Sequence, residues 1–161
     1  MGFFKSKKGA IISDYFKLLE DIGGGYTANN MYDVALYDEY LEISSSFAKN
    51  KINLDYSKIT DVVYSAEIEE IQKSKSSIGR AIAGGMLFGG VGAVVGAISG
   101  TGTKTKKERH FYFIIAYTSA QGEEKFLQFE DTRLYKGTKI AKKLKELCRL
   151  EDNNNSDDIN L

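Results

Sequence analysis

Hydrophobic and polar side chains alternate along much of the chain between positions 32 and 66. The alternation is clear over residues 32–36, and it returns over residues 40–44 after an Asp-Glu pair. Residues 52–56 and 59–66 repeat it. A period of two predicts strands with one buried face, and the short spacing predicts a hairpin followed by further antiparallel strands.

The strand pattern resumes after Arg109 and leads into an amphipathic helix. Residues 111–118 carry apolar side chains on both faces, which predicts a central strand covered on both sides, with residues 125–130 as its partner. Residues 140–148 place apolar side chains on one helical face and lysines on the other. The predicted fold is α+β and mainly β: a small antiparallel barrel with a C-terminal helix.

The segment from residue 10 to residue 22 is ambiguous. Its apolar residues recur at spacings of three and four, which favours a helix, although Phe16, Leu18 and Glu20 could equally begin a strand. Three successive glycines then end the segment. The basic tip before it, residues 1–9, could touch an anionic membrane surface or stay solvated.

A glycine-rich stretch over residues 77–104 interrupts the strands. No charged residue occurs between Arg80 and Lys104, and small residues recur four apart along it. On a helix, this spacing lines one face with small residues and lets two backbones approach closely, as in packed membrane helices. The stretch is therefore predicted to be a device for packing or membrane insertion.

The length of this stretch limits how it could meet a membrane. One helical crossing takes about 20 residues, so a single crossing would leave the two sets of strands on opposite sides. A hairpin of two short helices that turns near residues 89–92 avoids this. The residues predicted to contact lipid or another copy are Ala81, Ile82, Gly85, Phe88, Gly89, Gly92, Val95, Gly96 and Gly100. The basic flank predicted to face anionic lipid is Lys73, Lys75, Arg80, Lys104, Lys106, Lys107 and Arg109.

Other readings of the stretch stay open. Glycine costs about 1 kcal/mol relative to alanine in a helix, so the stretch could instead be two short helices packed on the sheet, an oligomer core, or a flexible loop. A phosphate-binding loop is disfavoured, because the glycines at 90–96 miss the G-x-G-x-x-G spacing by one residue.

Composition and candidate chemistry argue against an enzyme. Lysine plus arginine and aspartate plus glutamate number 22 each, so the net charge near zero gives no case for nucleic acid. The single histidine, His110, and the single cysteine, Cys148, cannot build a structural zinc site. The lone cysteine also excludes an internal disulfide. We therefore expect no catalytic residue, metal, cofactor or small-molecule substrate.

The order of strands, glycine-rich insertion, strands and helix resembles that of bacterial and phage proteins with a pleckstrin-homology-like domain, of the Gram-positive type. The resemblance covers about residues 32–150, and its specific parts are SSIGRAIAGGMLFGGVGAVVGAISGTG, HFYFIIAYTS and EEKFLQFED. It implies a seven-stranded, barrel-like sheet capped by the helix, and a binding module without catalytic activity.

These features divide the chain into a tip (1–9), the first part of the domain (10–74), the insertion with its basic flanks (75–107), the second part with the helix (108–150) and a disordered acidic tail (151–161). Residues 32–74 and 108–150 are expected to fold together, with 78–102 as an excursion.

The expected function is that of a membrane-associated binding or scaffold protein at the cytoplasmic face of the cell membrane, whose glycine-rich hairpin meets lipid or its own copies. One alternative is a soluble adaptor that binds a protein partner and oligomerises through the hairpin. The other is a phage or mobile-element factor that acts on the host membrane.

Overall fold

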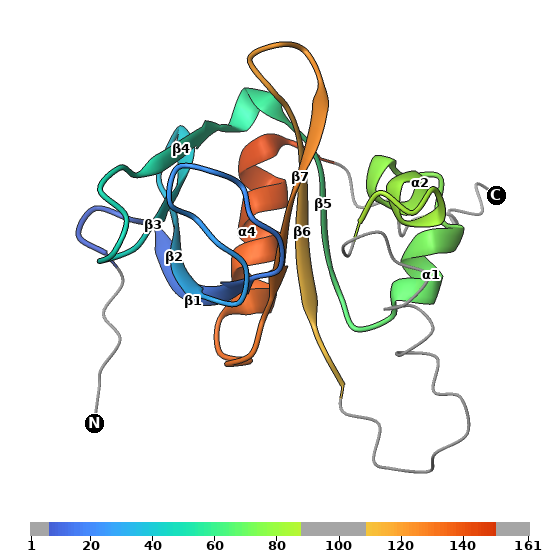
Figure 1. Ribbon diagram of the computed structural model, residues 1–161, viewed down its shortest axis with the longest axis horizontal. Coiled ribbons are helices and arrows are strands. Elements are labelled where there is room, and N and C mark those ends of the chain that lie inside the picture. The colour runs from blue at the N-terminus through green and yellow to red at the C-terminus, as the bar shows by residue number, and fades with distance from the viewer. Residues whose placement is uncertain (1–6, 88–108, 151–161) are drawn as a thin grey trace, which may run out of the picture.

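The computed structural model describes residues 7–87 and 109–150, which form one sheet with helices on both sides (Figure 1). The strands and helices follow one another in this order: β1 (Ile12–Leu18), β2 (Met31–Leu36), β3 (Tyr40–Ser44), β4 (Ile52–Asp55), the 3-10 helix η1 (Tyr56–Lys58), β5 (Ile59–Ser65), α1 (Ile68–Lys73), α2 (Ser77–Ala83), β6 (Tyr112–Thr118), β7 (Glu124–Glu130) and α4 (Gly137–Cys148).

The seven strands pair antiparallel in the order β4-β3-β2-β1-β7-β6-β5. The mainly β fold, the hairpin of β2 and β3 and the C-terminal helix are confirmed. The helix favoured for residues 10–22 is wrong, because β1 pairs with β2 from Ile12 to Lys17 and places Phe16 and Leu18 in the core. Tertiary pairing outweighs the helical spacing here.

The sheet does not close into the predicted barrel. β4 and β5 lie at opposite ends of the strand order. The chain between them forms η1. Asp55 caps this helix, since its side chain accepts a hydrogen bond from the Ser57 amide. η1 separates β4 from β5, so the two strands form no hairpin. α4 lies between the two halves of the open sheet and contacts both β5 and β1 (Figure 1).

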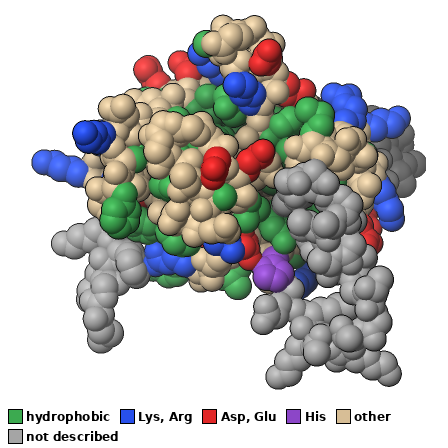
Figure 2. Space-filling view, in the orientation of Figure 1, with side chains coloured by type: hydrophobic (Ala, Val, Ile, Leu, Met, Phe, Trp, Pro, Cys, Tyr) green, Lys and Arg blue, Asp and Glu red, His purple; other side chains and the backbone are tan. Residues whose placement is uncertain are grey.

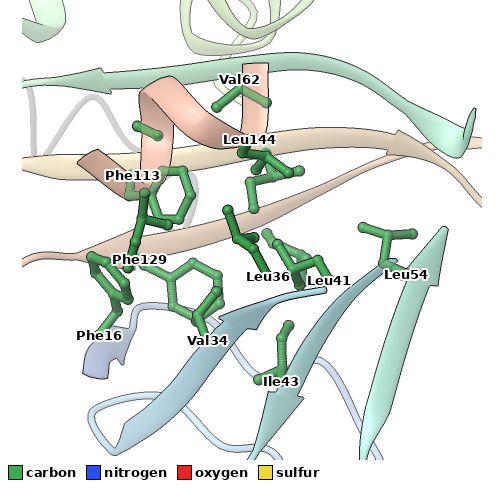
Figure 3. Close-up of a cluster of buried hydrophobic side chains, with 14 of the residues drawn as sticks. Phe16, Val34, Leu36, Leu41, Ile43, Leu54, Val62, Phe113, Phe129 and Leu144 are labelled. Atoms are coloured by element: carbon green, nitrogen blue, oxygen red, sulfur yellow. The ribbon is translucent and has the colours of Figure 1, made fainter. Parts of the chain in front are cut away.

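The main core lies between the inner face of the sheet and α4. Phe16, Phe113 and Phe129 meet at ring-centroid distances of 5.2–6.2 Å, and Leu144 of α4 is fully buried in the same cluster (Figure 3). Aromatic rings at these distances in tilted arrangements contribute beyond their buried area. This core joins residues from both sides of the glycine-rich insertion, as expected.

β6 is buried on both faces, as its sequence predicts. Phe113 and Ile115 point into the main core. Tyr112, Ile114 and Ala116 belong to a second apolar cluster on the outward face. The residues that cover this second face come from α1, α2 and the segment that follows them, on the right in Figure 1.

Candidate functional site

α1 and α2 form a short helical hairpin, here called the α1–α2 cap and defined as residues 68–87. Ser76 caps α2 by accepting a hydrogen bond from the Gly79 amide at 3.0 Å. The Ile78 amide donates to Oδ2 of Asp61 on β5 at 3.2 Å. These two contacts fix where α2 starts and attach its first turn to the sheet.

Gly79 allows the two helices of the cap to approach each other. A Cβ atom at this position would lie 2.6 Å from the Ser74 carbonyl oxygen and even closer to the Ile71 carbonyl oxygen. Real Cβ atoms do not approach backbone at such distances, so any larger residue would force α1 and α2 apart. A small residue at this position therefore serves packing within the chain.

The cap covers the outward face of β6 with apolar side chains. Ile78, Ile82 and Leu87 are buried against Tyr112 and Ile114. Burying each large apolar side chain is worth roughly 1.5–3 kcal/mol, so these three contribute on the order of 4–9 kcal/mol. The cap thus belongs to the stable core of the domain.

This packing corrects one expectation from the sequence. Ala81 and Ile82 were predicted to face lipid or another copy, but in the folded chain they are only 4% and 6% exposed and lie in the second cluster. The physical reason is that the apolar outward face of β6 needs a cover, and α2 is the neighbouring apolar segment.

α2 ends at Ala83, and the chain then turns through two glycines. Gly85 has φ +74°, a left-handed conformation that ends helices and favours glycine. Met86, directly after it, is 65% exposed, which makes it the exposed apolar side chain of the cap. The other residues predicted to contact lipid or a copy lie outside the described residues: Phe88, Gly89, Gly92, Val95, Gly96 and Gly100.

The basic flank is exposed where the structure describes it. Lys73, Lys75, Arg80 and Arg109 all reach the surface, and Figure 2 shows several basic side chains on the side where α1 and α2 lie. The sequence interpretation missed that acidic residues accompany this flank. The remaining members of the flank, Lys104, Lys106 and Lys107, lie outside the described residues.

Two acidic residues next to the flank pair with its cations. Glu70 lies 3.8 Å from the Lys73 ammonium, and Glu67 lies 3.5 Å from the Arg109 guanidinium. All four side chains are largely exposed, so each pair contributes little to stability. The pairs do lower the positive charge that this surface presents.

The chain returns to the sheet after the glycine-rich stretch through His110. Its Nδ1 lies 2.5 Å from Oε1 of Glu130, whose Oε2 accepts from the Lys17 ammonium at 2.8 Å. Burial raises the pKa of Glu130, but the hydrogen bonds from Lys17 and His110 outweigh that effect and bring the pKa below its ordinary value. The ionised Glu130 thus joins β1, β7 and His110, two residues before β6.

The described residues offer no obvious catalytic chemistry. Burial raises the pKa of the Cys148 thiol to about 12, so the thiolate needed for nucleophilic attack is not formed near neutral pH. His110 is engaged with Glu130. Within residues 7–87 and 109–150, no three histidine, cysteine, aspartate or glutamate side chains are placed to hold a metal ion.

A polar cluster that the sequence interpretation did not predict lies on the outward face of β2 and β3. The Lys7 ammonium binds Oε1 of Glu42 at 2.7 Å and the hydroxyl of Ser44, and lies 3.9 Å from Oδ2 of Asp33. Lys7 belongs to the basic tip that the sequence predicts to touch an anionic membrane surface or stay solvated, but here it lies against the sheet. The only sequence signal for this cluster is the placement of Asp33 and Glu42 within predicted strands.

Comparisons with known proteins identify the family. A family profile described as "Glycine zipper containing PH domain" matches residues 26–129, which span β2 to β7 and the whole insertion. No curated protein and no solved structure matches the chain. The described part of the structure holds no helix that is long and apolar enough to span a membrane. The chain belongs to the family of glycine zipper-containing PH domains.

Proposed function

We propose that this protein is a non-enzymatic binding or scaffold module that attaches to the cytoplasmic face of a membrane through its glycine-rich segment. PH-like domains are generally binding modules, which supports the absence of catalysis. The attachment is supported by residues 81–103, which carry no charge and bring together large apolar side chains with glycines four apart.

The packing of the α1–α2 cap is the observation that carries this proposal. Ile114 and Ala116 on the outward face of β6 are fully buried in a cluster with residues of the cap. The inner face of β6 is filled by the main core. Both faces of the central strand are therefore occupied by described residues, and the sequence holds further large apolar side chains after residue 87. Lipid is a partner that would take such side chains from water.

A second candidate is a soluble adaptor that self-associates through the same segment and binds a protein partner. The ion pairs of Glu67 with Arg109 and of Glu70 with Lys73 favour this candidate, because they reduce the attraction of the cap to anionic lipid. A membrane-disturbing factor is a variant of the first candidate, and it predicts loss of membrane potential when the protein is expressed.

Fractionation of cells that express the tagged full chain tests the proposal. We expect the protein in the membrane fraction, resistant to high salt and released by detergent. A variant with residues 88–103 replaced by a Gly/Ser linker keeps the described cap and should move to the soluble fraction. If the unaltered chain is soluble without detergent and forms a defined oligomer, the adaptor is correct and the membrane proposal is wrong.

Gly96→Ile separates packing from simple hydrophobicity. The substitution makes the stretch more apolar while adding bulk to the face that Gly92, Gly96 and Gly100 would share on a helix. Overpacking costs about 1–3 kcal/mol, so cross-linked oligomer in membranes should fall, whereas Val94→Ile should resemble the parent. If Gly96→Ile and the parent cross-link equally, these glycines do not form a packing face.

Neutralising Lys104, Lys106, Lys107 and Arg109 together tests the basic flank. Each cation near an anionic surface is worth about 1 kcal/mol, and salt screens this contribution. Binding to vesicles that contain phosphatidylserine should drop, and the drop should be largest at low salt. Equal binding of variant and parent at every salt concentration would contradict a role for these cations.

A further inference from the structure

Two buried carboxylates lie side by side on the outward face of β2 and β3. Asp33 is opposite Ser44 in the register and Ala35 is opposite Glu42, so both acidic side chains point away from the main core. Asp33 is 7% exposed and Glu42 is 4% exposed. Lys7, from the segment that precedes β1, lies close to both carboxylates.

Fold stability alone does not account for this arrangement. Removing two carboxylates from water is costly, and replacing a buried ion pair by apolar side chains is often neutral or stabilising. Burial raises the pKa of Asp33, and the neighbouring charges of Glu42 and Asp14 raise it further, against the opposing effects of Lys7 and Lys136. Ala35, opposite Glu42 and on the same face as Asp33, is fully buried, so an apolar side chain is accommodated there.

The Lys7 ammonium does not fill the hydrogen-bonding capacity of the site. It contacts Glu42 at 2.7 Å but stays 3.9 Å from Oδ2 of Asp33. The other oxygen of that carboxylate, Oδ1, is buried and has no hydrogen-bond partner in the part of the chain that the structure describes. A buried acceptor normally has a partner, so Oδ1 of Asp33 can accept a further donor.

A guanidinium group suits these carboxylate acceptors better than an ammonium group does. An ammonium is a compact charge with three donors, whereas a guanidinium presents five donors in a planar fork and pairs with carboxylates bidentately. A fork bound to Glu42 can extend a second pair of donors toward Asp33. Lys51, at the rim, reaches Oε1 of Glu42 at 3.6 Å, so cations from two different segments already converge on this carboxylate.

We propose that Asp33, Glu42 and Ser44 form a recognition pocket for an arginine side chain of a protein partner, and that Lys7 occupies this pocket from within the same chain. The N-terminal segment then competes with the partner, and binding requires that Lys7 leave. The pocket lies on β2 and β3, separated from β6 and the α1–α2 cap by β1 and β7 in the sheet. It is therefore independent of the membrane proposal.

Direct binding tests the pocket in the full chain with Lys7→Met, which keeps the aliphatic stem and removes the charge. The probes are N-acetyl-arginine amide and its neutral counterpart N-acetyl-citrulline amide at constant ionic strength, followed by backbone NMR shifts. We expect saturable shifts at Asp33, Glu42 and Ser44 with the arginine probe. Hydrogen bonds to charged groups are stronger than those between neutral groups. The citrulline probe should therefore bind at least about tenfold more weakly than the arginine probe.

Two comparisons complete this experiment. The unaltered chain should bind the arginine probe more weakly than Lys7→Met, because Lys7 competes, and adding Asp33→Asn to Lys7→Met should weaken binding again. Equal shifts with arginine and citrulline, or equal binding by the single and double variants, would overturn the proposal.

Lys7→Arg provides a measurement that needs no ligand and no vacant pocket. The guanidinium should supply a further donor to Asp33, so the melting temperature should rise above that of the unaltered chain. The rise should disappear in the Asp33→Asn background. Lys49→Arg, at an exposed position between β3 and β4, is the matched control and should change nothing. If Lys7→Arg gives no gain over this control, the pocket does not favour guanidinium and the proposal fails.

Discussion

The hydroxyl of Tyr64 donates a hydrogen bond to Oδ2 of Asp131 at 2.8 Å, and this contact attaches β5 to the loop that leads into α4. The other oxygen of Asp131 accepts from the amides of Arg133 and Leu134. Gly137, the first residue of α4, packs so closely that a Cβ atom there would lie 2.7 Å from the Tyr64 ring. The edge strand β5 is thereby joined to the helix that fills the open side of the sheet.

Tyr64→Phe should destabilise the fold by about 1.5–3 kcal/mol near neutral pH, the range for a hydrogen bond to a charged group. Denaturant unfolding measures this loss. Burial and the bond to Asp131 raise the pKa of Tyr64. A raised folded-state pKa means that this stability is present below the ordinary value of 10.0 and is lost at higher pH. The difference between the variant and the parent should therefore shrink in strongly alkaline buffer, and a constant difference would contradict this account.

Gly79→Ala tests the close approach of α1 and α2. Helix propensity alone predicts a gain of up to about 1 kcal/mol for this change. The backbone oxygens of Ile71 and Ser74 leave no room for a Cβ atom, so we expect a net loss in denaturant unfolding. Ala83→Gly, at an exposed position near the end of α2, is a control that changes propensity without crowding. A stabilised Gly79→Ala would show that the helices can separate at little cost.

Two linker replacements should locate the boundary of the excursion. Replacing residues 88–107 keeps the cap, so the protein should unfold cooperatively with stability near that of the parent. Replacing residues 78–102 also removes Ile78, Ile82 and Leu87, which contribute on the order of 4–9 kcal/mol, comparable with the net stability of a typical domain. This second variant should bind a dye for exposed apolar surface. Equal stability of the two variants would mean that the cap is dispensable.

Asp33→Asn should stabilise the protein at neutral pH. Because burial raises the pKa of Asp33, the folded state favours the protonated acid, and stability falls as the pH rises from the ordinary value of 3.8 through the folded-state pKa. The amide does not ionise, so the melting temperature of the variant should exceed that of the parent at pH 7 and approach it below pH 3.8.

Glu42→Gln is the matched control for Asp33→Asn. It weakens the 2.7 Å bond to Lys7 and should lower the melting temperature at pH 7. If Asp33→Asn and Glu42→Gln shift the melting temperature in the same direction, the two carboxylates do not have the different roles assigned to them.

Glu130→Gln should change stability in the opposite direction from Asp33→Asn at neutral pH. The pKa of Glu130 is lowered by its bonds to Lys17 and His110, despite burial, so its stabilisation is present above the ordinary value of 4.5 and is lost as the pH falls through the folded-state pKa. We expect a loss of about 1 kcal/mol at neutral pH, after allowance for solvent screening, and a smaller loss in acid. Melting curves at several pH values measure it, and a pH-independent loss would implicate packing instead.

Local sequence patterns predict most of the strands and the C-terminal helix. Period-two alternation identifies the strands that carry Val34, Leu41 and Val62, and apolar residues on both faces identify β6 as a covered strand. Helical spacing identifies α4. These patterns are local, since each side chain reports which face of its own element is buried.

Which segment covers which face depends on contacts between distant parts of the chain. Residues 10–22 form a strand because β2 pairs with them, although their spacing favours a helix. Ala81 and Ile82 lie on β6 because a covered strand needs a partner, and sequence spacing does not distinguish a sheet from lipid as that partner. In the pocket, Lys7 meets Asp33 and Glu42, which lie 26 and 35 positions further along the chain. Such contacts depend on strand register, which no local pattern records.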